Sequence, residues 1–219
     1  MNKKRVIVIV GILAVMLLAT TAFAARGRSR GATARVYWNW DVADEVNPVG
    51  MSILSRSQDR VKTNYFTSEL TPGQAMTLWF IFFNYPDLCS DGVCGLDDLG
   101  ADKPAQGDFH LADGRVIGNR GYTWFRGSLN VGDISGSGLA ELGMEPVALV
   151  NPKGALFNLA VHSHGPALTG DDLIAQLNSY TGGCIMPFLG IDGFAGGFDE
   201  LPVNPGECST IQQSIHIPK

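Results

Sequence analysis

The hydrophobic positions of the chain fall mostly in short runs separated by glycine and proline. β-Branched and aromatic residues dominate residues 36–40 and 61–67, which predicts two strands. Residues 75–84 are almost continuously apolar and lie between two proline-containing turns. A short run of this kind is typical of a central strand buried on both faces.

Later runs continue the same pattern. We expect further strands at residues 108–112, 115–117, 122–131, 147–150, 155–163 and 211–217. Residues 169–180 instead favour a helix, because Leu173, Ile174 and Leu177 form an apolar stripe. The predicted fold is all-β: a single disulfide-stapled β-sandwich, jelly-roll-like, with one short helix near residues 170–180.

The beginning of the sequence has a different pattern. Lys3, Lys4 and Arg5 precede the uncharged residues 6–18, and Ala22-Phe23-Ala24 follows. This order predicts a secretory signal peptide over residues 1–24. The apolar run is shorter than the roughly 20 residues that span a bilayer. We therefore expect no transmembrane anchor after cleavage, and a periplasmic or extracellular protein.

The expected mature chain has two parts. Residues 25–34 are rich in arginine, glycine and serine, which favours a flexible basic arm that could also touch anionic lipid or a cell-wall polymer. Residues 35–219 form the single β domain. The net charge is −5 for the whole chain and becomes −8 once the three basic residues of the leader are removed. This acidic balance argues against nucleic acid as a partner.

The four cysteines are expected to form disulfides, because an even set in an exported protein is typical of a disulfide framework. Three pairings are possible. Cys89–Cys94 with Cys184–Cys208 is the simplest, since each pair brackets a loop-like segment. The Cys89–Cys94 spacing fits neither a zinc knuckle nor a thioredoxin-type motif.

His162 and His164 are the clearest candidate for chemistry. In a strand, residues two apart point to the same face, so both imidazoles could approach one metal ion. His110 or His216 could supply a third ligand, and copper, zinc or iron would suit imidazole. The alternative is a pair of hydrogen-bonded histidines at a strand end.

Five aspartates crowd the segment around Cys89 and Cys94, and carboxylates on a loop can bind Ca²⁺. Their spacing does not fit an EF-hand, and solvated loop acids are the alternative interpretation. These residues are Asp87, Asp91, Asp97, Asp98 and Asp102.

Catalysis finds little support in the sequence. A nucleophile elbow, a phosphate-binding loop and a zinc-protease helix motif are all absent. Trp38 and Trp40 share one face of their predicted strand and could stack against sugar rings, although core packing is the commoner role of such residues.

Several segments, taken in order, resemble a family of uncharacterised exported bacterial proteins with an all-β fold. They are residues 70–84, the Cys89–Cys94 loop with the following Gly-Leu-Asp-Asp, and residues 127–133, 151–155 and 163–167. The family's Ser-His-Gly-Pro unit matches residues 163–166. The resemblance therefore implies that His164, rather than His162, is the position shared with the family.

Together these observations predict a non-enzymatic binding or envelope-associated protein, with a glycan or a cell-envelope component as a possible partner. One alternative is a metal-binding protein or small metalloenzyme centred on His162 and His164. We expect no cofactor otherwise; the candidate divalent metals are copper, zinc and, at the acidic loop, calcium. Another is an extracellular structural subunit that assembles through exposed edge strands.

Overall fold

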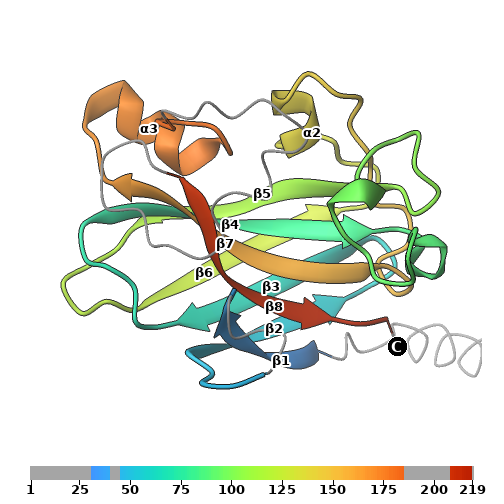
Figure 1. The fold of residues 1–219 in the computed structure, drawn as a ribbon, viewed down its shortest axis with the longest axis horizontal. Coiled ribbons are helices and arrows are strands. Elements are labelled where there is room, and N and C mark those ends of the chain that lie inside the picture. The colour runs from blue at the N-terminus through green and yellow to red at the C-terminus, as the bar shows by residue number, and fades with distance from the viewer. Residues whose placement is uncertain (1–30, 40–44, 185–207, 219) are drawn as a thin grey trace, which may run out of the picture. The chain divides into compact units, whose positions relative to one another are not determined.

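The computed structural model describes residues 31–39, 45–184 and 208–218 (Figure 1). The expected signal peptide and Trp40 lie outside these residues. The strands are β1 (Gly31–Trp38), β2 (Gly50–Arg56), β3 (Arg60–Thr67), β4 (Gln74–Phe83), β5 (Gly107–Val116), β6 (Thr123–Asn130), β7 (Leu156–Pro166) and β8 (Ser209–His216). The helices are α2 (Gly138–Glu141), α3 (Gly170–Asn178) and the 3₁₀ turns η1 (Pro86–Leu88) and η2 (Leu96–Asp98).

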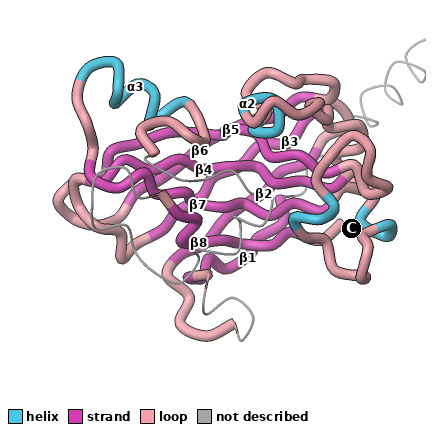
Figure 2. Tube along the Cα trace, turned by 45° about the horizontal axis from the view of Figure 1, so that its top comes forward, coloured by secondary structure: helices cyan, strands magenta, loops and turns pink. Residues whose placement is uncertain are grey.

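All eight strands belong to one antiparallel sheet with the order β5-β4-β7-β8-β1-β2-β3-β6 (Figures 1 and 2). β1 links its two halves. Residues 31–36 of β1 pair with β2, whereas Tyr37 and Trp38 pair with β8. β1 begins before residue 35, so the last residues of the expected basic arm are part of this strand.

The two ends of the strand order meet. The backbone N–H of Arg126 in β6 donates to Oδ2 of Asp113 in β5 at 2.9 Å. Gly127 approaches Ala112 so closely that an added Cβ would lie 2.7 Å from the Ala112 Cβ. The all-β class, a disulfide and a helix near residues 170–180 are thus confirmed. A sandwich of two separate sheets is not confirmed, because hydrogen bonding through β1 makes the sheet continuous.

β4 is buried on both faces, as its sequence predicted. Met76, Leu78, Phe80 and Phe82 point into the main core with Phe157, Leu159 and Val161 of β7. The alternate residues Thr77, Trp79, Ile81 and Phe83 point to the opposite face. We call this second surface of β4, β7 and β8 the outer face, and it carries the candidate site.

α2 and α3 both pack on β5 (Figures 1 and 2). An added Cβ on Gly138 of α2 would meet the Phe109 ring, and one on Gly114 of β5 would lie 2.0 Å from the Leu177 carbonyl oxygen of α3. The predicted apolar stripe of α3 is wrong in one respect. Ile174 is 59% exposed, and the residue that the helix buries completely is Gln176.

Gln176 is buried because it bonds to the strand end beneath the helix. Its side-chain oxygen accepts a hydrogen bond from the Leu168 N–H, and its Nε2 donates to the carbonyls of His164 and Pro166. A polar side chain with its groups satisfied can replace an apolar one in this position.

Two segments differ from the predicted strands. β2 was not predicted, because its inward positions include the polar Ser52 and Arg56. Residues 147–150 were predicted as a strand but form none. The backbone N–H groups of Val147 and Val150 instead donate to the side chains of Asp108 and Asn84.

Arg56 ties three segments together from inside the structure. Its guanidinium donates to the carbonyls of Pro152 and Ala155 before β7, and to those of His216 and Ile217 at the end of β8. It also lies over the Phe157 ring, 5.1 Å from the centroid. Burial lowers the pKa of Arg56 to about 10, which leaves it charged at neutral pH.

The simplest of the three possible pairings is the one present: Cys89 bonds to Cys94, and Cys184 to Cys208. Disulfides form and persist in oxidising compartments, which indicates a location outside the cytoplasm. In the described part of the chain, no helix has the length and apolar character needed to cross a membrane.

Candidate functional site

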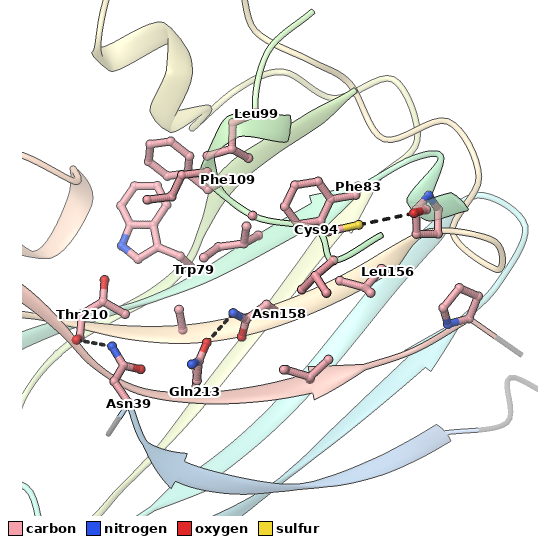
Figure 3. Close-up of a pocket in the computed structure, with 18 of the residues that line it drawn as sticks. Asn39, Trp79, Phe83, Cys94, Leu99, Phe109, Leu156, Asn158, Thr210 and Gln213 are labelled. Atoms are coloured by element: carbon pink, nitrogen blue, oxygen red, sulfur yellow. Dashed lines mark hydrogen bonds between the residues drawn. The ribbon is translucent and has the colours of Figure 1, made fainter. Parts of the chain in front are cut away.

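A cavity of about 720 Å³ lies against the outer face of β4, β7 and β8 (Figure 3). Register explains its floor. Trp79 pairs with Ala160, Ile81 with Asn158, and Asn158 in turn with Ile215, so one row of side chains faces the cavity. This volume falls within the range typical of small-molecule sites.

The segment from η1 to η2 forms one wall of the cavity, through residues 86–87, 92–96 and 99. The Cys89–Cys94 disulfide closes this loop. Asp98 braces it, because its buried carboxylate accepts hydrogen bonds from the N–H groups of Ser90 at 2.8 Å and Gly95 at 3.0 Å. The wall is therefore held by covalent and polar contacts rather than by a strand.

Three aromatic residues form one end of the cavity. The Trp79 ring contacts Phe109 and Tyr180 edge-on, with centroids 5.5 and 5.3 Å away. Phe109 and Tyr180 are 4.8 Å apart. Because burial raises the pKa of Tyr180 to about 12, its hydroxyl stays protonated at neutral pH despite a hydrogen bond with Thr210.

Side-chain amides supply the polar part of the lining (Figure 3). Asn158 Nδ2 donates to Gln213 Oε1 at 2.5 Å, and Asn39 Nδ2 donates to the Thr210 carbonyl at 2.5 Å. Oδ1 of Asn158 and Oδ1 of Asn39 are buried, and neither has a hydrogen-bond partner among the described residues. Both residues line the cavity, so a ligand there would lie beside these acceptors.

The two predicted histidines meet beside this cavity, next to its lining residue Tyr180. Both lie in β7 and are buried, and their ring centroids are 4.9 Å apart in an edge-to-face arrangement. The strand geometry that predicted a shared face is confirmed. His162 also stacks on Tyr180 at 4.4 Å, which joins the histidines to the aromatic end of the cavity.

A chain of hydrogen bonds fixes the tautomer of His164. Nδ1 lies 2.9 Å from the Gly182 carbonyl, which can only accept, so Nδ1 carries the proton. Nε2 then accepts from the Thr77 hydroxyl at 2.9 Å. That hydroxyl accepts from Trp79 Nε1 at 2.8 Å. Both nitrogens of His164 are thus engaged.

His162 is less completely paired. Nδ1 lies 3.3 Å from the Thr210 hydroxyl, whereas the buried Nε2 has no partner in the described part of the chain. Burial, with a smaller contribution from His164, lowers the pKa of His162 well below 6.5. Burial likewise lowers the pKa of His164 to about 4. Both imidazoles are therefore neutral at pH 7.

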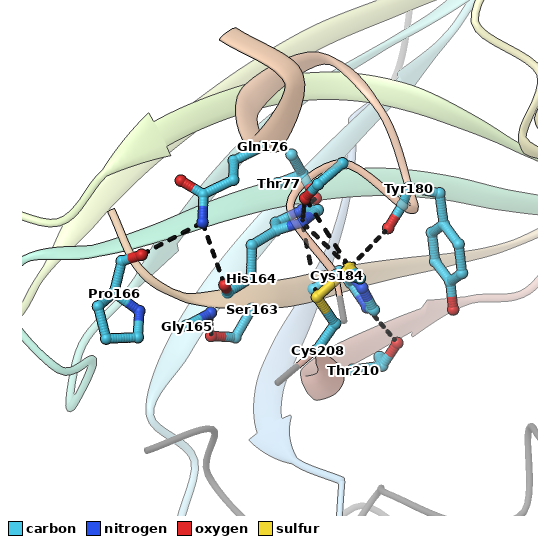
Figure 4. Close-up of a disulfide and its surroundings, with 12 residues drawn as sticks. Thr77, Ser163, His164, Gly165, Pro166, Gln176, Tyr180, Cys184, Cys208 and Thr210 are labelled. Carbon is cyan, nitrogen blue, oxygen red and sulfur yellow. Dashed lines mark hydrogen bonds between the residues drawn. A yellow bond between two sulfur atoms is a disulfide. The ribbon is translucent and has the colours of Figure 1, made fainter. Parts of the chain in front are cut away.

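The Cys184–Cys208 disulfide completes the cluster (Figure 4). Nδ1 of His164 lies 3.7 Å from Sγ of Cys184 and 4.0 Å from Sγ of Cys208. One ligand atom from each of the four residues lies within 4.8 Å of the others, so this group could hold a metal ion. The sulfur atoms are, however, bonded to each other.

The expected third ligand is not a histidine. His216 lies 2.8 Å from the Ser52 hydroxyl in the core, and His110 lies against Phe82, also in the core. Both are on the opposite face of the sheet from His162. Sequence reasoning missed that the cysteines lie beside these histidines, because this depends on the β7–β8 register that pairs His162 with Thr210, close to Cys208.

The aspartates of the Cys89–Cys94 loop do not form a comparable cluster in the described residues. The carboxylate of Asp98 is occupied by backbone N–H groups, and Asp91 accepts from the Val93 N–H at 2.9 Å. Asp102 lies 4.0 Å from Lys103 and is largely exposed. These contacts agree with the alternative interpretation: Asp102 is a solvated acid, whereas Asp91 and Asp98 brace the loop.

Trp38 lies in the core rather than on an open surface. It is 8% exposed, and its Nε1 donates to Glu69 Oε2 at 3.3 Å. Its predicted partner Trp40 lies outside the described residues, so sugar stacking by this pair stays a prediction. The aromatic residues that do line a cavity are Trp79, Phe83, Phe109 and Tyr180.

Comparison with known proteins returned no match to a family model, a curated protein or a solved structure. The resemblance to exported bacterial all-β proteins therefore stays a prediction, and the site has to be interpreted from its own geometry.

Proposed function

We propose that the protein is a binding protein whose cavity takes a neutral, hydroxylated ligand with an apolar ring face, the chemistry of a short glycan. The observation that carries this proposal is a pair of buried acceptors, Oδ1 of Asn39 and Oδ1 of Asn158, on an otherwise largely apolar lining. Within the described residues neither acceptor has a donor. Ligand hydroxyls would supply the missing donors.

The charge of the lining supports a neutral ligand. Among the described lining residues Asp87 is the one with a full charge, and its side chain is exposed. A phosphate or a carboxylate would find no cationic partner there, although such groups are usually bound by arginine or lysine. Trp79, Phe109 and Tyr180 offer the aromatic surface that a sugar ring or another apolar ring would contact.

Binding is favoured over catalysis by the same residues. General acid–base chemistry needs a titratable group within reach of the ligand. Of the lining residues that the structure describes, only the exposed Asp87 and the protonated Tyr180 could take this role. The assembly alternative has less support, because the edge strands β5 and β6 lie against each other.

We place this activity outside the cytoplasm, in an exported or envelope-associated protein. The leader-like residues 1–24 and the two disulfides support this location. If a metal is bound as well, the imidazole and sulfur groups of the cluster favour zinc or copper over calcium, which prefers oxygen ligands.

The test is calorimetric titration with a panel of neutral mono- and oligosaccharides, and with uronic acids and sugar phosphates as charged counterparts. We expect a neutral sugar to bind and its charged counterpart to bind at least tenfold more weakly. Asn158→Ala should weaken binding about tenfold, equivalent to about 1.4 kcal/mol. The control Asn130→Ala changes an exposed asparagine that does not line the cavity. A panel without any binder, or equal effects of the two variants, would contradict the proposal.

A further inference from the structure

The Cys184–Cys208 disulfide occupies the place where a metal ion would lie. Its two sulfur atoms, one ring nitrogen of His162 and one of His164 all lie within 4.8 Å of one another. A disulfide sulfur is a poor metal ligand, since metals bind the thiolate. The oxidised protein therefore offers two imidazoles but no thiolate.

We propose that reduction of Cys184–Cys208 converts this cluster into a four-ligand site for Zn²⁺, made of two thiolates and two imidazoles. Two cysteines with two histidines are a common ligand set of structural zinc sites. None of the four residues lines the cavity, so the inference does not depend on the proposed ligand.

The distances suit a tetrahedral centre. Zinc binds sulfur at about 2.3 Å and imidazole nitrogen at about 2.0–2.1 Å, which separates neighbouring nitrogen and sulfur ligands by about 3.5 Å. His164 Nδ1 already lies 3.7 and 4.0 Å from the two sulfur atoms. The main change required is that the sulfur atoms, now 2.04 Å apart, separate once their bond is broken.

His162 provides an independent sign of a missing ligand. His162 is only 5% exposed, so water cannot easily reach its Nε2. This nitrogen nevertheless has no hydrogen-bond partner in the described residues. Buried polar atoms in proteins are nearly always paired, and an orphan of this kind needs an explanation. In the tautomer whose Nδ1 donates to the Thr210 hydroxyl, this nitrogen has a lone pair that can bind a cation.

The chemistry balances with a dithiol as reductant. The dithiol gives two electrons and two protons to the Cys184–Cys208 bond and becomes a cyclic disulfide, which leaves two cysteine thiols. Zn²⁺ then displaces one proton from each thiol. His164 changes tautomer, because Nδ1 binds the metal while Nε2 takes up the proton. Thr77 Oγ1, which lies 2.9 Å from His164 Nε2, then accepts a hydrogen bond from the newly protonated nitrogen.

Disulfide and metal are mutually exclusive in this site. In an oxidising compartment the sulfur atoms stay paired and the metal site does not exist. In a reducing environment, or before oxidation of the newly made chain, zinc would hold β7, β8 and the segment after α3 in place of the disulfide.

The matched control is the second disulfide, Cys89–Cys94, in a loop that contains no histidine. The full chain is reduced with a dithiol, desalted without oxygen and titrated with Co²⁺, whose thiolate charge-transfer absorption reports cobalt–sulfur bonds. We expect one Co²⁺ per chain in the reduced wild type and in the Cys89→Ser/Cys94→Ser double variant, displaced by one equivalent of Zn²⁺. The Cys184→Ser/Cys208→Ser variant should give no such band, and His162→Ala should weaken binding at least tenfold.

Alkylation provides a second measurement. Zn²⁺ should slow the reaction of Cys184 and Cys208 with iodoacetamide at least tenfold and leave Cys89 and Cys94 unaffected, as followed by peptide mass spectrometry. The proposal is overturned if the reduced wild type gives no charge-transfer band, if the Cys184→Ser/Cys208→Ser variant keeps the band, or if Zn²⁺ protects both cysteine pairs equally.

Discussion

Oγ1 of Thr77 lies 2.9 Å from Nε2 of His164, and both side chains are completely buried. The same hydroxyl accepts the indole N–H of Trp79. One threonine therefore joins a histidine of the cluster, whose tautomer the Gly182 carbonyl sets, to a tryptophan of the cavity. Its hydrogen bonds connect the two parts of the candidate site.

Thr77→Val tests this connection, because valine keeps the shape of threonine and removes the hydroxyl. Trp79 Nε1 and His164 Nε2 would both lose a buried partner, and each loss costs about 1–3 kcal/mol. We expect the free energy of unfolding in urea to fall by about 3 kcal/mol. Thr63→Val is the control, since the buried Thr63 hydroxyl only donates to the Ile53 carbonyl at 3.3 Å. If the unfolding free energy falls equally in the two variants, the hydrogen bonds of Thr77 to Trp79 and His164 do not contribute the expected stability.

Acid should destabilise the fold through its buried histidines. Burial lowers the pKa of His164 and of His216 to about 4, with Arg56 contributing to the shift of His216. The unfolded state, in which the pKa is about 6.5, then binds more protons than the folded state. Stability is complete above about pH 6.5 and is lost as the pH falls toward 4, by about 2 kcal/mol for each histidine between pH 7 and pH 5.

Urea unfolding at pH 7, 6 and 5 measures this effect. His216→Gln keeps a polar group near Ser52 but does not titrate, so its stability should change less between pH 7 and pH 5 than that of the wild type. A wild-type stability that stays constant down to pH 5 would show that the histidines do not titrate in this manner.

Arg56→Met should be among the most destabilising substitutions. The carbonyls of Pro152, Ala155 and His216 would lose their donor inside the structure, which predicts a loss of about 3–5 kcal/mol. The unfolding free energy of Arg56→Lys should lie between those of Arg56→Met and the wild type, because a lysine cannot reach both groups of carbonyls. Arg60→Met, at an exposed position of β3, should change the unfolding free energy by less than about 0.5 kcal/mol. A similar small change in Arg56→Met would disprove the role assigned to this arginine.

Gly114→Ala tests the packing of α3 on β5. The new Cβ would lie 2.0 Å from the Leu177 carbonyl oxygen, so the end of the helix has to move away from the strand. We expect a loss of about 1–3 kcal/mol in thermal or urea unfolding. Gly118→Ala adds the same methyl group where no atom lies within 4 Å, and it should leave stability nearly unchanged. If both variants unfold like the wild type, α3 does not pack closely on Gly114.

The strands that the sequence predicted well are those whose inward side chains are mostly apolar. β3 and β4 were found because their β-branched and aromatic residues are continuous or alternate regularly. β2 was missed because Ser52 and Arg56 point inward, where each is satisfied by a partner distant in sequence. Residues 147–150 were misread because Asp108, rather than a neighbouring strand, accepts the Val147 N–H at 2.7 Å.

The candidate site divides in the same way. The shared face of His162 and His164 follows from strand geometry alone, and the sequence predicted it. The closeness of Cys184 and Cys208 to these histidines depends on the pairing of β7 with β8, which local pattern does not contain. The amides of Asn39 and Asn158 were not predicted as ligand contacts, because asparagine is common in loops and strand ends.

β8 lies between β7 and β1, although it is the last described strand to be synthesised. Until residues 209–216 have left the ribosome, β1 and β7 both keep an open edge and the two halves of the sheet cannot join. Pairing of strands so distant in sequence is slow to form. The topology therefore delays closure of the sheet until its last described strand, β8, has been made.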